Sequence, residues 1–136
     1  MQNTLSPTVL VVDDEETIRN IARRILESAG YRVLEARGGS EALALVDSDK
    51  AIDLLMADLE MPEMRGEEMA RRIRVSQPDL KVLYVTGYAD RLFDRNGLLW
   101  EGEAYLDKPF TSRGLVEAVS LLICGHPSSK APQLHL

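Results

Sequence analysis

Short apolar runs in this 136-residue chain are each followed by polar residues that could take part in chemistry. These residues are Asp13 and Asp14, Asp58, Thr86 and Lys108. If each run is a strand of one parallel sheet, the carboxyl ends of the strands meet at one edge, where open α/β sheets bind ligands. We therefore expect three carboxylates, a hydroxyl and an amine to share one pocket.

Three carboxylates in one pocket repel one another, and their pKa values rise. A divalent cation relieves this repulsion. Oxygen ligands favour Mg²⁺, which binds through one or two carboxylates together with phosphate oxygens. The amine of Lys108 indicates that a further anion is held there, and a phosphoryl group fits. Phosphoryl transfer needs a nucleophile, a metal and cationic groups, and a carboxylate such as Asp58 can be the nucleophile.

The remaining pattern alternates strands with helices. Apolar runs predict strands over residues 8–12, 32–36, 52–57, 81–85 and 104–106. Apolar residues at helical spacing predict a first helix with one stripe made of Ile18, Ile21, Ala22, Ile25, Leu26 and Ala29. Further helices are expected over 41–46, 67–75, 90–100 and 112–123. Gly30 is the expected C-cap of the first helix, and Ser40 the expected N-cap of the second. Five strands and five helices in alternation predict an α/β fold with a doubly wound parallel sheet.

Composition limits the class of protein. The formal net charge of -6 argues against a nucleic-acid binder held by a basic surface. The single cysteine, Cys124, allows no intrachain disulfide, which suits a reducing cytosol. No apolar stretch approaches the roughly 20 residues that cross a bilayer. We expect a soluble, cytoplasmic domain over residues 8–124, with an N-terminal extension over 1–7 and a tail or linker over 125–136.

Four segments carry a resemblance to a known family. The runs VLVVDDEE, DLLMADLEMPEMRG, VLYVTGYAD and AYLDKPF resemble those of receiver domains in bacterial two-component response regulators, in the same order. The resemblance covers about residues 8–124. It implies a flavodoxin-like fold with strand order 2-1-3-4-5. It also implies a phosphoacceptor signalling module in a phosphorelay, which catalyses only its own Mg²⁺-dependent phosphorylation and dephosphorylation.

The resemblance assigns roles to the residues of the pocket. Asp58 matches the phosphoacceptor, which receives the phosphoryl group from a phosphohistidine. The Mg²⁺ ligands implied are Asp13, Asp14, Asp58 and Glu60, the last through its backbone carbonyl. Lys108 matches the lysine that pairs with the phosphoryl oxygens, and the family has a cis peptide bond after it. The alternative to metal binding for Asp13 and Asp14 is a structural role as the N-cap and first-turn charge of the helix that follows.

Two further pairs of residues match positions that transmit or time the signal. Thr86 matches the hydroxyl that turns toward the phosphoryl group, and Tyr105 the aromatic that then changes rotamer. An amphipathic edge residue is the plain alternative for Tyr105. Glu60 and Tyr88 match the variable positions that set the lifetime of the phosphoryl group, and a ring at Tyr88 is expected to slow its hydrolysis.

The resemblance also implies the partner, a sensor histidine kinase or a histidine phosphotransfer domain. The loose segment between TGYAD and KPFT resembles receivers attached to hybrid sensor kinases, so covalent attachment within a longer parent is expected.

Two alternatives to the receiver function stay open. The Asp58-Leu59-Glu60 run resembles the nucleophile motif of haloacid-dehalogenase-like aspartyl phosphatases, although Glu60 stands where that family has a second aspartate. The other alternative is a pseudo-receiver that binds partners without being phosphorylated.

Overall fold

A computed structural model describes residues 6–48, 51–87 and 102–124 of the chain. Within these ranges the elements are β1 (Thr8–Val12), α1 (Glu16–Ser28), β2 (Arg32–Ala36), α2 (Gly39–Asp47), β3 (Leu54–Asp58), α3 (Gly66–Ser76), β4 (Lys81–Thr86), β5 (Glu103–Asp107) and α5 (Ser112–Cys124). The strands form one parallel sheet in the order β2-β1-β3-β4-β5. This confirms the predicted fold class and strand order. The helix expected over 90–100 lies outside the described residues.

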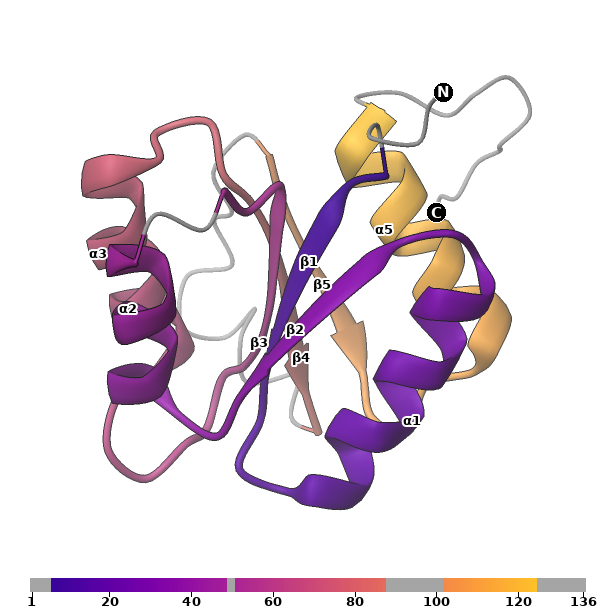
Figure 1. Ribbon diagram of the computed structural model, residues 1–136. Helices are drawn as coiled ribbons and strands as arrows, with labels where there is room; N and C mark the ends of the chain where they lie inside the picture. The colour runs from indigo at the N-terminus through magenta and orange to yellow at the C-terminus, as the bar shows by residue number, and fades with distance from the viewer. Residues whose placement is uncertain (1–5, 49–50, 88–101, 125–136) are drawn as a thin grey trace.

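The sheet separates two apolar cores because its central strands β1, β3 and β4 are buried on both faces. Figure 1 shows α2 and α3 together on one face of the sheet and α1 and α5 on the other. The register neighbours Leu10, Leu55 and Val82 belong to the core under α2 and α3. Their chain neighbours Met56 and Leu83 belong to the core under α1 and α5. Side chains thus alternate between two helix layers, which explains why the central strands β1, β3 and β4 are mostly apolar, whereas the edge strands β2 and β5 carry charged residues.

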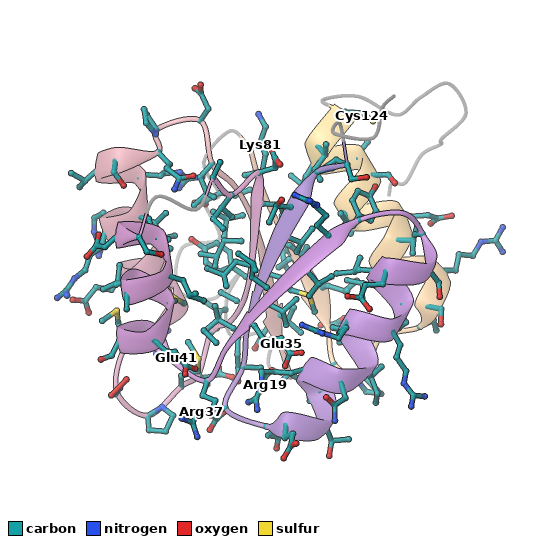
Figure 2. The ribbon with its side chains drawn as sticks, in the orientation of Figure 1. Arg19, Glu35, Arg37, Glu41, Lys81 and Cys124 are labelled. Atoms are coloured by element: carbon teal, nitrogen blue, oxygen red, sulfur yellow. The ribbon has the colours of Figure 1, made fainter. Side chains whose placement is uncertain are left out.

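All five strands run in the same direction, so the sheet has an amino end and a carboxyl end. In Figure 2, Lys81, the first residue of β4, lies at the amino end, whereas Arg37, directly after β2, lies at the carboxyl end. The polar residues predicted to share a pocket all lie at the carboxyl end. Among the described residues, no helix combines the length and apolar character needed to span a bilayer.

The ends of α1 and α2 test two capping predictions. The C-cap of α1 is Ala29 rather than the predicted Gly30, which directly follows it and has a φ of 98°, a left-handed conformation that glycine adopts readily. The prediction that Ser40 caps α2 is wrong, because the helix begins at Gly39 and its N-cap is Gly38. A Cβ on Gly39 would lie 2.6 Å from the Met64 Sδ. The helix thus begins two residues before its predicted start at residue 41, and the local sequence does not reveal that Met64 packs against Gly39.

The buried face of α1 is also rotated from its predicted position. Ala22 and Leu26 are fully buried, as expected, but Ile21 is 43% exposed. The third buried residue of the helix is Arg19, a charged residue. Positions 19, 22 and 26 share one helical face, so the helix turns an arginine toward the sheet where the sequence predicted only apolar side chains.

A buried polar cluster joins α3 to the edge of the sheet. Arg74 Nη1 lies 2.7 Å from Glu103 Oε2, and Arg74 Nη2 donates a hydrogen bond of 3.1 Å to the Leu80 carbonyl. The Tyr84 hydroxyl donates a hydrogen bond of 3.1 Å to the same Glu103 oxygen. Burial, reinforced by the negative charge of Glu103, raises the pKa of the Tyr84 hydroxyl. Tyr84 therefore stays protonated and keeps donating to Glu103.

Replacing Arg74 by methionine is expected to lower the free energy of unfolding by about 3 kcal/mol. The substitution leaves the Glu103 carboxylate, whose side chain is 7% exposed, without its guanidinium partner. Urea denaturation measures the loss. The control Arg72→Met removes an exposed pair with Glu68 and should cost less than about 0.5 kcal/mol. Equal losses in the two variants would contradict a stabilising role for the buried pair.

Candidate functional site

Four predicted site residues meet at the carboxyl end of the sheet. Asp13 directly follows β1, and Asp58 is the last residue of β3. Thr86 is the last residue of β4, and Lys108 directly follows β5. Parallel pairing between these adjacent strands brings their carboxyl ends to one edge. The structure therefore brings these residues together, as the strand pattern predicted.

Asp13, Asp14 and Asp58 form an acidic cluster, in which one carboxylate oxygen from each residue lies within 4.8 Å of the others. Asp13 is 3% exposed and Asp58 is 6% exposed, whereas Asp14 lies at the solvent boundary and is exposed. Burial raises the pKa of Asp58, and the negative charge of Asp13 adds to the shift. The carboxylates of Asp13 and Asp58 are charged oxygen ligands in a largely buried site. They fit a divalent cation such as Mg²⁺, which would relieve their repulsion.

Both buried carboxylates are oriented by the backbone two residues further along the chain. The Glu15 N–H donates a hydrogen bond of 2.9 Å to Asp13 Oδ1, and the Glu60 N–H donates one of 3.1 Å to Asp58 Oδ1. In this local turn an aspartate side chain accepts from the backbone ahead of it. The contact with Glu60 N–H opposes the rise in the pKa of Asp58. Because both backbone hydrogen bonds go to Oδ1, the second oxygen, Oδ2, of each carboxylate faces Lys108.

Lys108 bridges those two remaining oxygens. Its Nζ lies 3.2 Å from Asp13 Oδ2 and 3.5 Å from Asp58 Oδ2. Burial alone would lower the pKa of Lys108, but the charges of Asp13 and Asp58 outweigh burial and raise the pKa. The ammonium group is therefore fully charged at neutral pH. The peptide bond from Lys108 to Pro109 is cis, as the family resemblance implied.

The start of α3 lies against the backbone of Asp58. A Cβ on Gly66, the first residue of α3, would lie 3.0 Å from the Asp58 carbonyl oxygen and 3.4 Å from the Leu59 Cα. Any larger residue would push the helix away from the loop that follows β3. Glycine at position 66 thus allows α3 to pack directly beside the backbone of Asp58.

The residues predicted to transmit or time the signal lie around this cluster. Thr86 is fully buried, and its hydroxyl donates a hydrogen bond of 3.3 Å to Glu60 Oε1. Tyr105 on β5 is half-buried and packs against the core under α2 and α3. Tyr88 lies outside the described residues. The roles of Thr86 and Tyr105 in switching, and of Glu60 and Tyr88 in phosphoryl lifetime, stay predictions.

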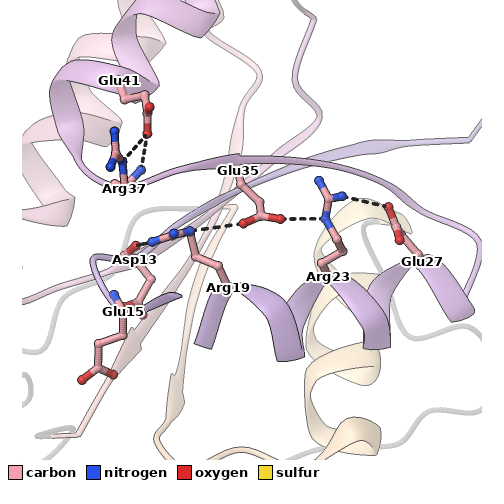
Figure 3. Close-up of polar contacts among 8 residues, drawn as sticks. All are labelled: Asp13, Glu15, Arg19, Arg23, Glu27, Glu35, Arg37 and Glu41. Atoms are coloured by element: carbon pink, nitrogen blue, oxygen red, sulfur yellow. Dashed lines mark hydrogen bonds and ion pairs between the residues drawn. The ribbon is translucent and has the colours of Figure 1, made fainter. Parts of the chain in front are cut away.

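A chain of buried and half-buried ion pairs behind the acidic cluster was missed by the sequence patterns. Figure 3 shows Arg19 reaching across from α1 to Glu35 on β2, with Arg23 on the far side of the same carboxylate. Helical spacing could have indicated that Arg19 is buried, because it lies on the same helix face as Ala22 and Leu26. A charged residue on a buried face predicts a partner of opposite charge on the element beneath it.

Comparison with known proteins identifies the class. The sequence matches the model of the response regulator receiver domain over residues 9–120. The chain is 38% identical over 119 residues to the sensor kinase CckA of Brucella abortus, a match that covers 87% of this chain and 13% of that kinase. The chain therefore belongs to the response regulator receiver domain family, and it spans a small part of this longer relative.

Solved structures agree with this assignment. A response regulator receiver protein from Sinorhizobium medicae superposes with a TM-score of 0.79 at 30% identity, covering 90% of this chain and 98% of that one. The response regulator TrrA of Thermotoga maritima, solved in complex with Mg²⁺ and BeF, gives a TM-score of 0.74 at 35% identity, covering 85% and 98%. The chain is accordingly a receiver domain, a signalling module rather than a conventional enzyme, and its acidic cluster is consistent with phosphoacceptor signalling. This assignment sets aside the aspartyl phosphatase alternative.

Proposed function

We propose that Asp58 is the phosphoacceptor and that Asp13, Asp14 and Lys108 prepare it for transfer. The observation that carries the proposal is the bridging position of Lys108, whose Nζ lies 3.2 Å from Asp13 Oδ2 and 3.5 Å from Asp58 Oδ2. A cation here faces the carboxylate oxygen that hydrogen bonding to the backbone leaves available. It is therefore in position to offset the charge of an incoming phosphoryl group.

In the proposed reaction, an oxygen of Asp58 attacks the phosphorus of a phosphohistidine on a partner protein. The O–P bond forms while the P–N bond breaks, and the departing imidazole keeps the bonding electron pair and takes up a proton. The Glu60 N–H holds the other oxygen of Asp58 in place. Lys108 neutralises negative charge on the transferred oxygens. Mg²⁺, held by Asp13, Asp14, Asp58 and the Glu60 carbonyl, would supply further charge stabilisation.

The same proposal covers the response to phosphorylation. The new dianion competes with Glu60 Oε1 for the Thr86 hydroxyl, now 3.3 Å from that oxygen. Movement of Thr86 toward the phosphoryl group would open space that Tyr105 fills. The surface that includes β5 and α5 then shifts between its conformational states, and a partner protein binds according to that shift. Glu60 thus both tunes phosphoryl lifetime and restrains the switch in this proposal.

The proposed partners are a sensor histidine kinase or a histidine phosphotransfer domain. The similarity to a small part of the kinase CckA supports attachment to a longer hybrid kinase as one arrangement. A cytoplasmic location belongs to the same proposal, since the single cysteine gives the chain no intrachain disulfide to maintain. The domain is proposed to occupy residues 8–124, with an extension over 1–7 and a tail or linker over 125–136.

Incubation with acetyl phosphate and Mg²⁺, followed by intact-mass measurement, tests the phosphoacceptor. Wild type should gain one phosphoryl group, and Asp58→Asn should gain none. Asp53→Asn is the matched control, because Asp53 directly precedes β3 at the end opposite Asp58, and this substitution should leave the adduct unchanged. An adduct that persists in Asp58→Asn would contradict the assignment. No adduct on wild type that binds Mg²⁺ would favour the pseudo-receiver alternative.

A further inference from the structure

Arg19 is a buried arginine next to the acidic cluster, and it touches the backbone between two members of that cluster. The residue is 9% exposed and comes from the first turn of α1. Its Nη1 donates a buried hydrogen bond of 2.8 Å to the carbonyl oxygen of Asp13. That oxygen belongs to the peptide group joining Asp13 to Asp14, so Arg19 holds the bond that connects the two residues.

The orientation of this peptide group decides where both carboxylates point. The peptide group that joins Asp13 to Asp14 lies between β1 and α1, outside both the strand ladder and the helix. On the other side of Asp13, its own N–H donates a hydrogen bond of 3.3 Å to the Ala36 carbonyl. With Arg19 on the following carbonyl, the peptide groups on both sides of Asp13 are held. Rotation of either one would swing a carboxylate away from the cluster.

Arg19 is itself fixed by a second contact. Its Nε donates a hydrogen bond of 3.2 Å to Glu35 Oε1, and Glu35 also pairs with Arg23, whose Nε lies 2.7 Å from Oε2. Figure 3 shows the resulting line of contacts from Asp13 through Arg19 and Glu35 to Arg23. Glu35 offsets the charge of Arg19 at close range. The guanidinium therefore acts on the cluster mainly through geometry, because a planar fork can meet two acceptors at once.

We infer that Arg19 is a positioning residue for Mg²⁺ binding, acting through the Asp13–Asp14 peptide group. The inference rests on the proposed metal site. Groups outside the ligand set that orient the ligands commonly change metal affinity by roughly 10–100-fold when they are removed. Arg19 contacts the backbone of a ligand pair, and its substitution should act on affinity for the metal more than on global stability.

Arg19→Met and Arg23→Met form a matched pair that tests the inference. Both remove an arginine of α1 that pairs with Glu35, but only Arg19 reaches Asp13. Isothermal titration with Mg²⁺ alone measures Kd, and thermal unfolding without metal measures stability. Arg19→Met should weaken Mg²⁺ binding by about tenfold or more, whereas Arg23→Met should stay within about twofold of wild type. Equal Kd values in the two variants would overturn the inference.

Arg19→Lys keeps the test decisive if Arg19→Met does not fold. A lysine retains the charge but lacks the planar fork, so it cannot hold Asp13 and Glu35 in the same geometry. Weaker Mg²⁺ binding by Arg19→Lys supports the positioning role, and wild-type affinity overturns it. A wild-type protein that binds no Mg²⁺ would instead contradict the proposed metal site, so the two failures are distinguishable.

Discussion

Asp58→Asn is expected to raise the free energy of unfolding by about 1 kcal/mol at pH 7 in metal-free buffer, a Tm increase of roughly 3–6 °C. The same substitution removes the proposed phosphoacceptor. Asp58 is 6% exposed, and burial together with the charge of Asp13 raises its pKa. Asparagine has nearly the same shape and can still accept the hydrogen bond from the Glu60 N–H. It lacks the charge, so the fold gains stability when the site loses its function.

The raised pKa of Asp58 determines whether its charge stabilises or destabilises the fold at each pH. A carboxyl group whose pKa is higher in the folded state than in the unfolded state holds its proton more tightly when folded. The stability it contributes is present below the unfolded pKa, near the ordinary value of 3.8, and is lost as pH rises through the raised folded pKa. At pH 7 the ionised Asp58 therefore costs stability. The advantage of asparagine should be largest at neutral pH and should shrink as pH falls toward 4.

Urea denaturation of wild type and Asp58→Asn from pH 8 down to pH 4.5 measures this difference. Asp79→Asn is the control, because it removes a charge from an exposed loop away from the cluster and should change stability by less than about 0.5 kcal/mol. An Asp58→Asn variant that is less stable than wild type at pH 7 would contradict the electrostatic cost assigned to Asp58. A gain that grows toward acid pH would contradict its stated cause.

The site could be predicted from sequence where position in the chain determines position in space. Asp13, Asp58, Thr86 and Lys108 each lie at or next to the end of a strand, and parallel pairing brings those ends together. Continuous apolar runs identify the strands, and period-3.6 patterns identify most of the helices, because burial follows directly from the spacing of apolar residues. The acidic cluster needed no knowledge of side-chain rotamers.

Partners chosen by long-range packing could not be predicted in the same way. Glu35 lies 16 positions from Arg19, and Glu103 lies 29 positions from Arg74. Each pair forms because a helix crosses the sheet at a particular rotation, and that rotation depends on the whole packed face. The exposure of Ile21 has the same origin, because α1 turns Arg19 rather than this isoleucine toward the sheet.

Lys108→Met is expected to slow phosphorylation of Asp58 by acetyl phosphate by about 100-fold or more, an effect typical of losing one preorganised charge at a transition state. The amine lies against Oδ2 of both Asp13 and Asp58, and these carboxylates raise its pKa, so the group is charged throughout the neutral range. Methionine fills a similar volume without charge. The transferred phosphoryl oxygens would then meet the buried carboxylates without this cation.

The time course of the intact-mass adduct measures the rate, and Lys81→Met is the matched control. Lys81 begins β4 at the amino end of the sheet, opposite the acidic cluster (Figure 2), so the same loss of charge should leave the rate within about twofold of wild type. A Lys108→Met rate close to that of Lys81→Met would contradict the role assigned to Lys108. Lys108→Arg, which keeps a positive charge at this position, should recover part of the rate.

Mg²⁺ affinity separates a lost catalytic charge from a collapsed site. In the absence of metal, Lys108 occupies Oδ2 of Asp13 and Asp58, and a cation entering the cluster must compete with it. Removing the lysine therefore removes a competitor, and Lys108→Met should bind Mg²⁺ at least as tightly as wild type. Slow phosphorylation combined with undiminished Mg²⁺ binding would mean that the carboxylates remain correctly placed. The lost rate then belongs to the charge of Lys108 at the transferred phosphoryl group.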